Sequence, residues 1–164
     1  MLITLHNLIN DIVPIEGISQ NEDGTFRIDY LQEPTPNQQE LITAAINSYP
    51  LIVAKVNRLK TIEEERNQIE KIGWDCGQGH LGLSSSDVAL LSGAFSLAKE
   101  ASNMGLPLPS IITMEDTQID FNNIQEMTML MLRYGAARAE LSKTFANRRR
   151  AVESATTIEE VNEA

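Results

Sequence analysis

The stretch that decides the fold is residues 122–154, NNIQEMTMLMLRYGAARAELSKTFANRRRAVES. Asn122, followed three residues later by Gln125, is a helix-start signal. Beyond it, apolar side chains recur every three or four residues across four heptads, the spacing of one helix face. Seven of nine positions in the series are apolar: Ile124, Met127, Met131, Tyr134, Arg138, Leu141, Phe145, Arg148, Val152. We predict one long amphipathic helix, buried all round between Met127 and Leu132, where nearly every position is apolar.

A second long helix is predicted over residues 50–72. Pro50 can occupy its first position, and about 23 residues at ~1.5 Å rise give a rod of about 35 Å. Its stripe packs either on the chain's own body, as in a linker helix, or against another subunit. The candidate interface positions on the two long helices are Ile52, Val56, Leu59, Ile62, Ile69, Met131, Tyr134, Leu141 and Phe145.

Upstream of these helices, turn and capping signals predict a small head module. A hairpin is expected from two alternating strands, Ile15–Ser19 and Thr25–Leu31, joined by a turn with Asp23-Gly24. A short amphipathic helix precedes the hairpin. Thr35-Pro36 with Gln38 starts a further helix, which the pair Tyr49-Pro50 is expected to break.

Between the two long helices, the sequence predicts two short hairpins and one more helix. The first hairpin carries Trp74 and Leu81, and the second covers residues 111–121. Ser84-x-x-Asp87 starts a helix that continues to about residue 103. Its apolar residues fall on two faces: Val88, Leu91 and Phe95 on one, and Leu90, Ala94 and Leu97 on the other. We therefore predict that it is the central helix of its module. Thr157 and Glu160 cap a short last helix.

These elements define an α+β fold that is predominantly α-helical. We predict an N-terminal helix–hairpin–helix module over residues 1–50 and a long connecting helix over residues 51–72. A helical C-terminal module with short hairpins follows over residues 73–164. The 164 residues, 42% of them hydrophobic, are enough to bury a real core.

Charge and composition exclude several classes of function. The formal net charge is −10, and a nucleic-acid-binding surface needs clustered positive charge. No apolar run approaches the length of a membrane span, and the first residues do not resemble a signal peptide. A single cysteine allows no intrachain disulfide and fits a reducing compartment. The acidic residues cluster in the first 54 residues, seven against one base, and in the tail from Glu153.

Motifs that carry chemistry are nearly absent. Cys76 and His80 are neighbouring soft ligands in a glycine-rich loop, but a structural zinc site needs four ligands and a thiol nucleophile needs a base and an orienting group. Met127, Met129 and Met131 either fill the core or line an adaptable groove. We predict no catalytic residues, no metal and no cofactor. A hydrolase or metal enzyme using the Cys76–His80 loop remains the alternative from another class.

Two parts of the chain resemble bacteriophage proteins. The segments Pro14–Ser19, Arg27–Tyr30 and Pro34–Gln38 resemble the front of small proteins encoded among phage tail genes. Residues from about 66 to 164 are similar to an uncharacterised helical domain at the ends of phage tail and tail-fibre proteins. The similarity rests on the glycine hairpin, Ser86-Asp87, Ala94 with Ala98, Ile112-x-Met114, Glu126-Met127 and Ala155–Glu160.

The resemblance implies a non-enzymatic tail component at the baseplate or fibre attachment, made in the host cytoplasm and located in the virion tail. We expect a homo-oligomer, a dimer or trimer, in contact with other tail, baseplate or fibre proteins, and no nucleic acid or membrane as partner. The alternative is a tail or tail-fibre assembly chaperone that is absent from the mature virion.

Overall fold

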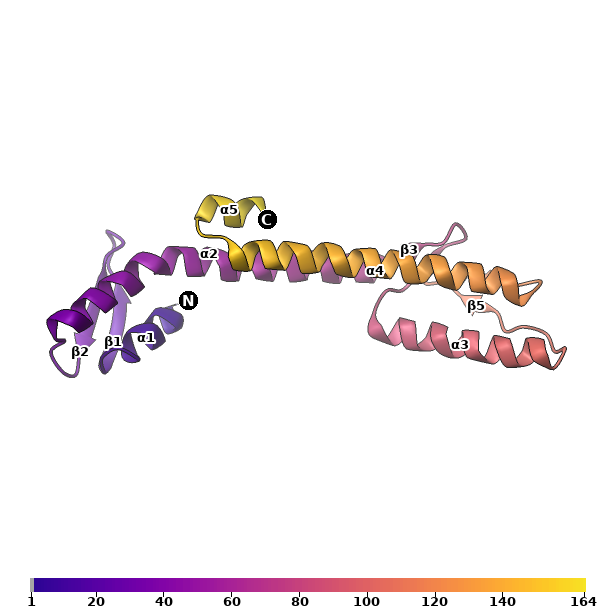
Figure 1. The fold of residues 1–164 in the computed structure, drawn as a ribbon, viewed down its shortest axis with the longest axis horizontal. Coiled ribbons are helices and arrows are strands. Elements are labelled where there is room, and N and C mark those ends of the chain that lie inside the picture. Colours follow the sequence, from indigo (N-terminus) through magenta and orange to yellow (C-terminus); the bar gives the residue numbers. More distant parts are fainter. Residues whose placement is uncertain (1) are drawn as a thin grey trace. The chain divides into compact units, whose positions relative to one another are not determined.

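The fold is α+β and predominantly helical, as predicted: 62% of the residues are helical, and the strands form short antiparallel pairs (Figure 1). It is described by a computed structural model that covers residues 2–164. Met1, part of the predicted first helix, lies outside the described residues. The elements are α1 (Leu2–Asn10), β1 (Ile15–Gln20), β2 (Phe26–Tyr30), α2 (Pro36–Ile72), β3 (Trp74–Asp75), β4 (His80–Leu81), α3 (Ser85–Asn103), β5 (Ile111–Ile112), β6 (Gln118–Ile119), α4 (Ile124–Ser154) and α5 (Ile158–Glu163).

Internal contacts divide the chain into two compact units. Unit 1 holds the chain up to Leu59 together with Ala151–Ala164, and unit 2 holds Lys60–Arg150. The sequence analysis divides the chain differently, with boundaries after residues 50 and 72. In unit 1 the C-terminal residues meet α2, where Lys55 Nζ donates a hydrogen bond to the Glu153 carbonyl oxygen at 2.8 Å.

Unit 1 is built on the predicted hairpin. Gly24 has a φ of 85°, which glycine adopts freely, and it allows the turn between β1 and β2. Three alternate residues of β2 pack against the core of the unit: Phe26, Ile28 and Tyr30. On the other side of the strand, Arg27 and Asp29 form an ion pair at 3.0 Å. The buried cluster around the hairpin consists of Leu5, Ile9, Val13, Ile15, Ile42 and Tyr49. Helix, hairpin and the start of α2 therefore share one core.

Strand β1 contains a bulge at Glu16. Ile15 pairs with Tyr30 and Gly17 pairs with Asp29, so Glu16 is an extra residue without a partner in the ladder. Its side chain is exposed. A bulge of this kind bends its strand and increases the local twist.

The predicted break at Tyr49-Pro50 is wrong, because α2 runs through Pro50 as one helix of 37 residues. Proline removes a hydrogen bond to the carbonyl four residues earlier and costs about 3 kcal/mol in a helix interior. Side chains on both sides of it pack against the same core: Tyr49 is a member of that core and Val53 lies against it. Tertiary packing therefore outweighs the local penalty.

Unit 2 packs α3, α4 and the two short hairpins around a second core. Its buried members are Cys76, Leu81, Leu83, Leu91, Ala98, Ile111, Ile119, Met127 and Tyr134. The predicted capping box of α3 is confirmed: the Ser84 hydroxyl accepts from Asp87 N, and the Asp87 carboxylate accepts from Ser84 N. The Thr157–Glu160 box of α5, in unit 1, is confirmed in the same way.

Gly73 ends α2 with a φ of 81°. A Cβ at this position would lie 2.8 Å from the carbonyl oxygen of Leu81, closer than real Cβ contacts allow. Glycine is therefore required here both for its backbone conformation and for the close approach of β4. Across residues 2–164, no helix combines the length and the apolar character needed to cross a lipid bilayer.

Candidate functional site

The Cys76–His80 loop forms the β3–β4 hairpin. The side chains of Cys76 and His80 each form a hydrogen bond to another residue instead of to each other. Cys76 is 8% exposed, and its Sγ donates to the Gly79 carbonyl oxygen at 3.1 Å. The His80 ring instead meets Glu115, with 2.6 Å between Nδ1 and Oε1. Within residues 2–164 there is no group of three or more His, Cys, Asp or Glu side chains able to hold a metal. The thiol therefore lacks the hydrogen-bonded base that nucleophilic catalysis requires.

Glu115 joins the two hairpins of unit 2. Its Oε2 accepts a hydrogen bond from His80 N at 2.8 Å, and the neighbouring Met114 N donates to the His80 carbonyl oxygen at 2.8 Å. The hydrogen bond from the His80 main chain, with a second from the His80 ring, lowers the pKa of Glu115 from 4.5 to about 2. This contact between His80 and Glu115 links β4 to the β5–β6 turn.

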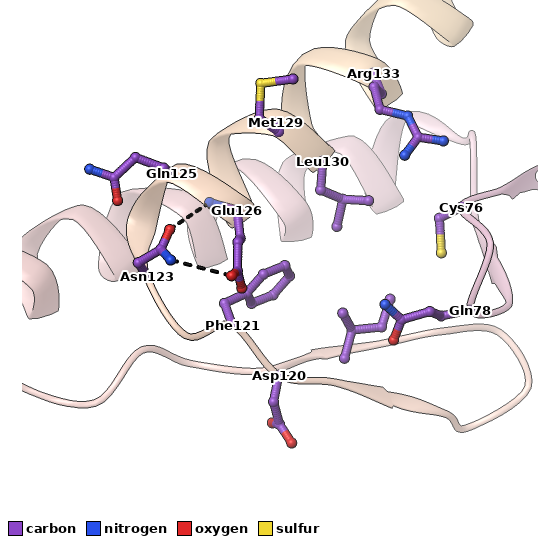
Figure 2. Close-up of a pocket in the computed structure, with 11 residues that line it drawn as sticks. Cys76, Gln78, Asp120, Phe121, Asn123, Gln125, Glu126, Met129, Leu130 and Arg133 are labelled. Atoms are coloured by element: carbon purple, nitrogen blue, oxygen red, sulfur yellow. Dashed lines mark hydrogen bonds between the residues drawn. The ribbon is translucent and has the colours of Figure 1, made fainter.

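A cavity of about 470 Å³ lies between the start of α4 and the two hairpins (Figure 2). Figure 2 shows Leu130 and Phe121 directed into this space, with Cys76 and Gln78 at its far side. The Arg133 guanidinium lies at the rim, 5.5 Å from the centroid of the Trp74 ring. The cavity is thus walled by apolar groups with polar groups at its edge.

The carboxylates of this cavity serve local structure. Glu126 accepts hydrogen bonds from the main chain and side chain of Asn122 at the start of α4, and these bonds lower its pKa. Asp120 accepts from the hydroxyl of Ser110 at 2.5 Å and from Gln118, which lowers its pKa. A general acid at neutral pH needs a raised pKa, so neither group is suited to that role.

The nine predicted interface positions divide by exposure. Ile62, Tyr134 and Phe145 are buried, with exposed fractions of 1%, 3% and 3%. Val56 and Ile69 are exposed, at 57% and 39%. The other positions, Ile52, Leu59, Met131 and Leu141, are partly buried. The buried side chains are covered by the chain itself, so only the remainder offers surface to another molecule.

Within each unit, a side chain joins α2 to α4 or to its end. In unit 2, Arg148 Nη1 donates to Glu65 Oε2 at 2.5 Å, and in unit 1 Lys55 contacts Glu153. Ile62 on α2 and Phe145 on α4 are both buried within the chain, so these two predicted interface positions are not open to another subunit.

The prediction that the helix ending near residue 103 is the central helix of its module is wrong, because only one of its two apolar faces is covered. Leu91 and Ala98 are buried, and Val88 and Phe95 pack against the same core. Exposed apolar side chains recur every seventh residue on another face: Leu90 at 73%, Leu97 at 66% and Met104 at 69%. Within the described chain, unit 2 supplies packing partners for only one face of α3. We call Leu90, Ala94, Leu97, Ala101 and Met104 the α3 stripe.

The prediction that α4 is buried all round between Met127 and Leu132 is also wrong. Met127 is fully buried, but Met129 and Leu132 are 59% and 63% exposed. The hairpins and α3 cover one side of α4 at this point, and nothing in residues 2–164 covers the opposite side to the same degree. Met129 and Leu132, which we call the α4 patch, form a second exposed apolar surface in unit 2.

Comparison with family models, with curated protein sequences and with solved structures gives no match. The α3 stripe and the α4 patch are accordingly assessed from their own residues. Sequence reasoning identified the second apolar face of α3 but assigned it to the core. The heptad spacing of Leu90, Leu97 and Met104 is the signal that could have marked it as a surface for association.

Proposed function

We propose that this chain is a non-enzymatic structural protein that acts through contacts with other protein subunits. The observation that carries the proposal is the exposure of large apolar side chains on α3 and α4. Leu90 and Leu132, for example, are 73% and 63% exposed. Contiguous apolar surface of this kind on a folded unit marks sites of protein association. Covering it stabilises a complex by about 25 cal/mol for each Å² removed from water.

The resemblance to phage proteins gives this proposal its biological setting. We infer a component of a bacteriophage tail, at the baseplate or the fibre attachment, that is made in the host cytoplasm and built into the virion tail. Tail assemblies have rotational symmetry, and a self-associating subunit fits such an assembly. Neighbouring tail or fibre proteins are the other partners of this proposal.

The absence of a catalytic role is part of the same proposal. Its support is the bonding of the candidate groups: the Cys76 thiol donates to a carbonyl oxygen, and the His80 ring is paired with Glu115. Asp120 and Glu126, at the cavity, have lowered pKa values and hold loop and helix-cap geometry. Each of these side chains has a structural partner instead of a catalytic one.

A second candidate function, a tail or tail-fibre assembly chaperone, is favoured by the exposed methionines. Met104, Met114 and Met129 are 69%, 50% and 59% exposed. Methionine is flexible and polarisable, and surfaces rich in it adapt to several partners. A chaperone would bind tail or fibre proteins during assembly and leave before the virion is complete.

Mass spectrometry of purified virions, with the infected-cell lysate as reference, separates the two functions. A structural component is expected in the virion at a fixed ratio to the tail proteins. A chaperone is expected in the lysate, bound to a tail or fibre protein, and absent from the virion. Absence from virions together with no tail-protein partner in the lysate would contradict both functions.

A further inference from the structure

The α3 stripe has the spacing of a helix–helix seam. Its members are separated by four, three, four and three residues, so they follow one line along the helix. Large residues alternate with small ones: Leu90, Leu97 and Met104 are exposed, whereas Ala94 and Ala101 are partly exposed between them, and Ala94 also packs against the core of unit 2. Such a surface has both the projections and the hollows that a helix–helix contact needs.

Four members of the stripe, Leu90, Ala94, Leu97 and Ala101, are complementary to themselves in one orientation. When two copies of α3 run antiparallel, Leu97 of one copy faces Ala94 of the other, and Leu90 faces Ala101. By symmetry each of these two contacts occurs twice, so the dimer has four leucine–alanine contacts along the helix pair. Because alanine is small, the two helix axes can approach to about 8 Å, the lower end of the usual distance between packed helices. A parallel pairing would instead place leucine on leucine and alanine on alanine.

The distribution of charge favours a second copy at this surface. Residues 88–98 contain no charged side chain. Unit 2 holds ten basic and twelve acidic residues, whereas unit 1 holds three basic and eleven acidic residues. Two copies that meet through unit 2 therefore bring together nearly neutral surfaces, whereas two copies of unit 1 would repel. Exposed Glu100 lies at the margin of the stripe and not in its line.

We propose that the α3 stripe is the self-association surface of this protein and that its occupant is α3 of a second copy, packed antiparallel to form a two-fold symmetric dimer. This inference rests on the proposed function, because it names the partner of one of the exposed apolar surfaces. The symmetry is closed: each copy contributes the same residues to both sides of the contact. One helix face is a small interface, so we expect a weak dimer whose formation depends on protein concentration.

Sedimentation velocity of the full chain over a concentration series tests the proposal. The wild-type protein is expected to dimerise, and a Leu90→Gln/Leu97→Gln variant to remain monomeric at concentrations where the wild type is dimeric. The matched control is Met129→Gln/Leu132→Gln, which removes two apolar side chains from α4 that are 59% and 63% exposed, against 73% and 66% for Leu90 and Leu97, and is expected to dimerise normally. Circular dichroism and thermal unfolding establish that both variants are folded.

The outcomes separate this inference from the proposed function. A dimer that survives the α3 variant and is lost in the α4 control would overturn the inference and leave self-association standing. A wild-type chain that stays monomeric at high micromolar concentration overturns the inference, whereas virion mass spectrometry still decides the proposed function. Loss of the dimer in the α3 variant alone supports both.

Cysteine crosslinking tests the antiparallel arrangement. In a Cys76→Ala background, which removes the native cysteine, we would mix a Gly93→Cys chain with a Glu100→Cys chain under mild oxidation. Both positions are exposed, and a Cβ at Gly93 meets nothing within 4 Å. The antiparallel dimer places the two positions next to each other, so the mixed crosslink is expected to dominate. Crosslinking of each variant mainly to itself would overturn the arrangement.

Discussion

The hydroxyl of Tyr134 on α4 donates a hydrogen bond to the carbonyl oxygen of Gly82, 2.7 Å away and 52 residues earlier in the chain. Tyr134 is 3% exposed, and its burial raises its pKa above 10. Tyr134 is one of the nine predicted interface positions. In the fold it instead fixes α4 to the segment between β4 and α3.

Replacing Tyr134 with phenylalanine tests this bond. Tyr134→Phe keeps the ring, which meets Trp74 edge to face, but leaves the Gly82 carbonyl without its donor. We expect the free energy of unfolding to fall by about 1–3 kcal/mol in urea titrations. Tyr30→Phe is the control, because the Tyr30 hydroxyl has no hydrogen bond in the described part of the chain, and its effect should be much smaller. Equal effects of the two changes would contradict the structural role of Tyr134.

The lowered pKa of Glu115 predicts a dependence of stability on pH. A carboxyl group whose pKa is lower in the folded state than in the unfolded chain stabilises the fold above its unfolded pKa, here 4.5. That contribution is lost as the pH falls from 4.5 toward about 2, the folded-state pKa. Glu115→Gln should therefore be less stable than wild type at pH 6, and the difference should vanish near pH 2. Thermal unfolding across this range measures it, and a difference independent of pH would contradict the prediction.

Gly73→Ala is expected to destabilise unit 2. Alanine is strained at a φ of 81°, and its Cβ would press on the carbonyl of Leu81. The expected loss is more than about 1 kcal/mol. Gly93→Ala serves as the matched control, since Gly93 lies in α3 with open space around it and alanine there should stabilise the helix by about 0.5–1 kcal/mol. Chemical denaturation below the dimerisation range compares the two, and a neutral Gly73→Ala would refute the argument.

Ile62 and Val56 test whether the stripe of α2 is covered within one chain. Ile62 is 1% exposed, and Ile62→Ala should cost about 2–5 kcal/mol of stability. Val56 is 57% exposed, and Val56→Ala should change stability by less than about 0.5 kcal/mol. Because Ile62 is covered by its own chain, its cost should not depend on protein concentration. A cost that grows with concentration would instead indicate that another subunit covers Ile62.

Local signals in the sequence predicted most of the elements. The cap at Ser84 and Asp87, the turn at Gly24 and the capping box at Thr157 depend on neighbours a few residues away, so a single sequence can reveal them. The break at Pro50 was wrong for the opposite reason. Whether a helix tolerates an interior proline depends on the core that the residues around it join, and that core includes side chains far away in sequence.

The candidate surface was predicted less well than the fold. An apolar helix face looks the same in sequence whether it packs on its own chain or remains exposed. Ile62 is a predicted interface position and is buried within the chain, whereas Leu90 lies on a helix predicted to be central to its module and is 73% exposed. Whether such a face is buried or exposed depends on how many other elements pack around the helix, and the spacing of apolar residues does not reveal that number.

The bulge at Glu16 affects how this protein can polymerise. A regular strand edge offers a row of unpaired main-chain groups on which further strands can grow into fibrils. The bulge at Glu16 bends and twists β1, and the exposed Glu16 side chain adds a negative charge that a growing sheet would have to desolvate. The hairpin of unit 1 is thereby protected against edge-to-edge growth.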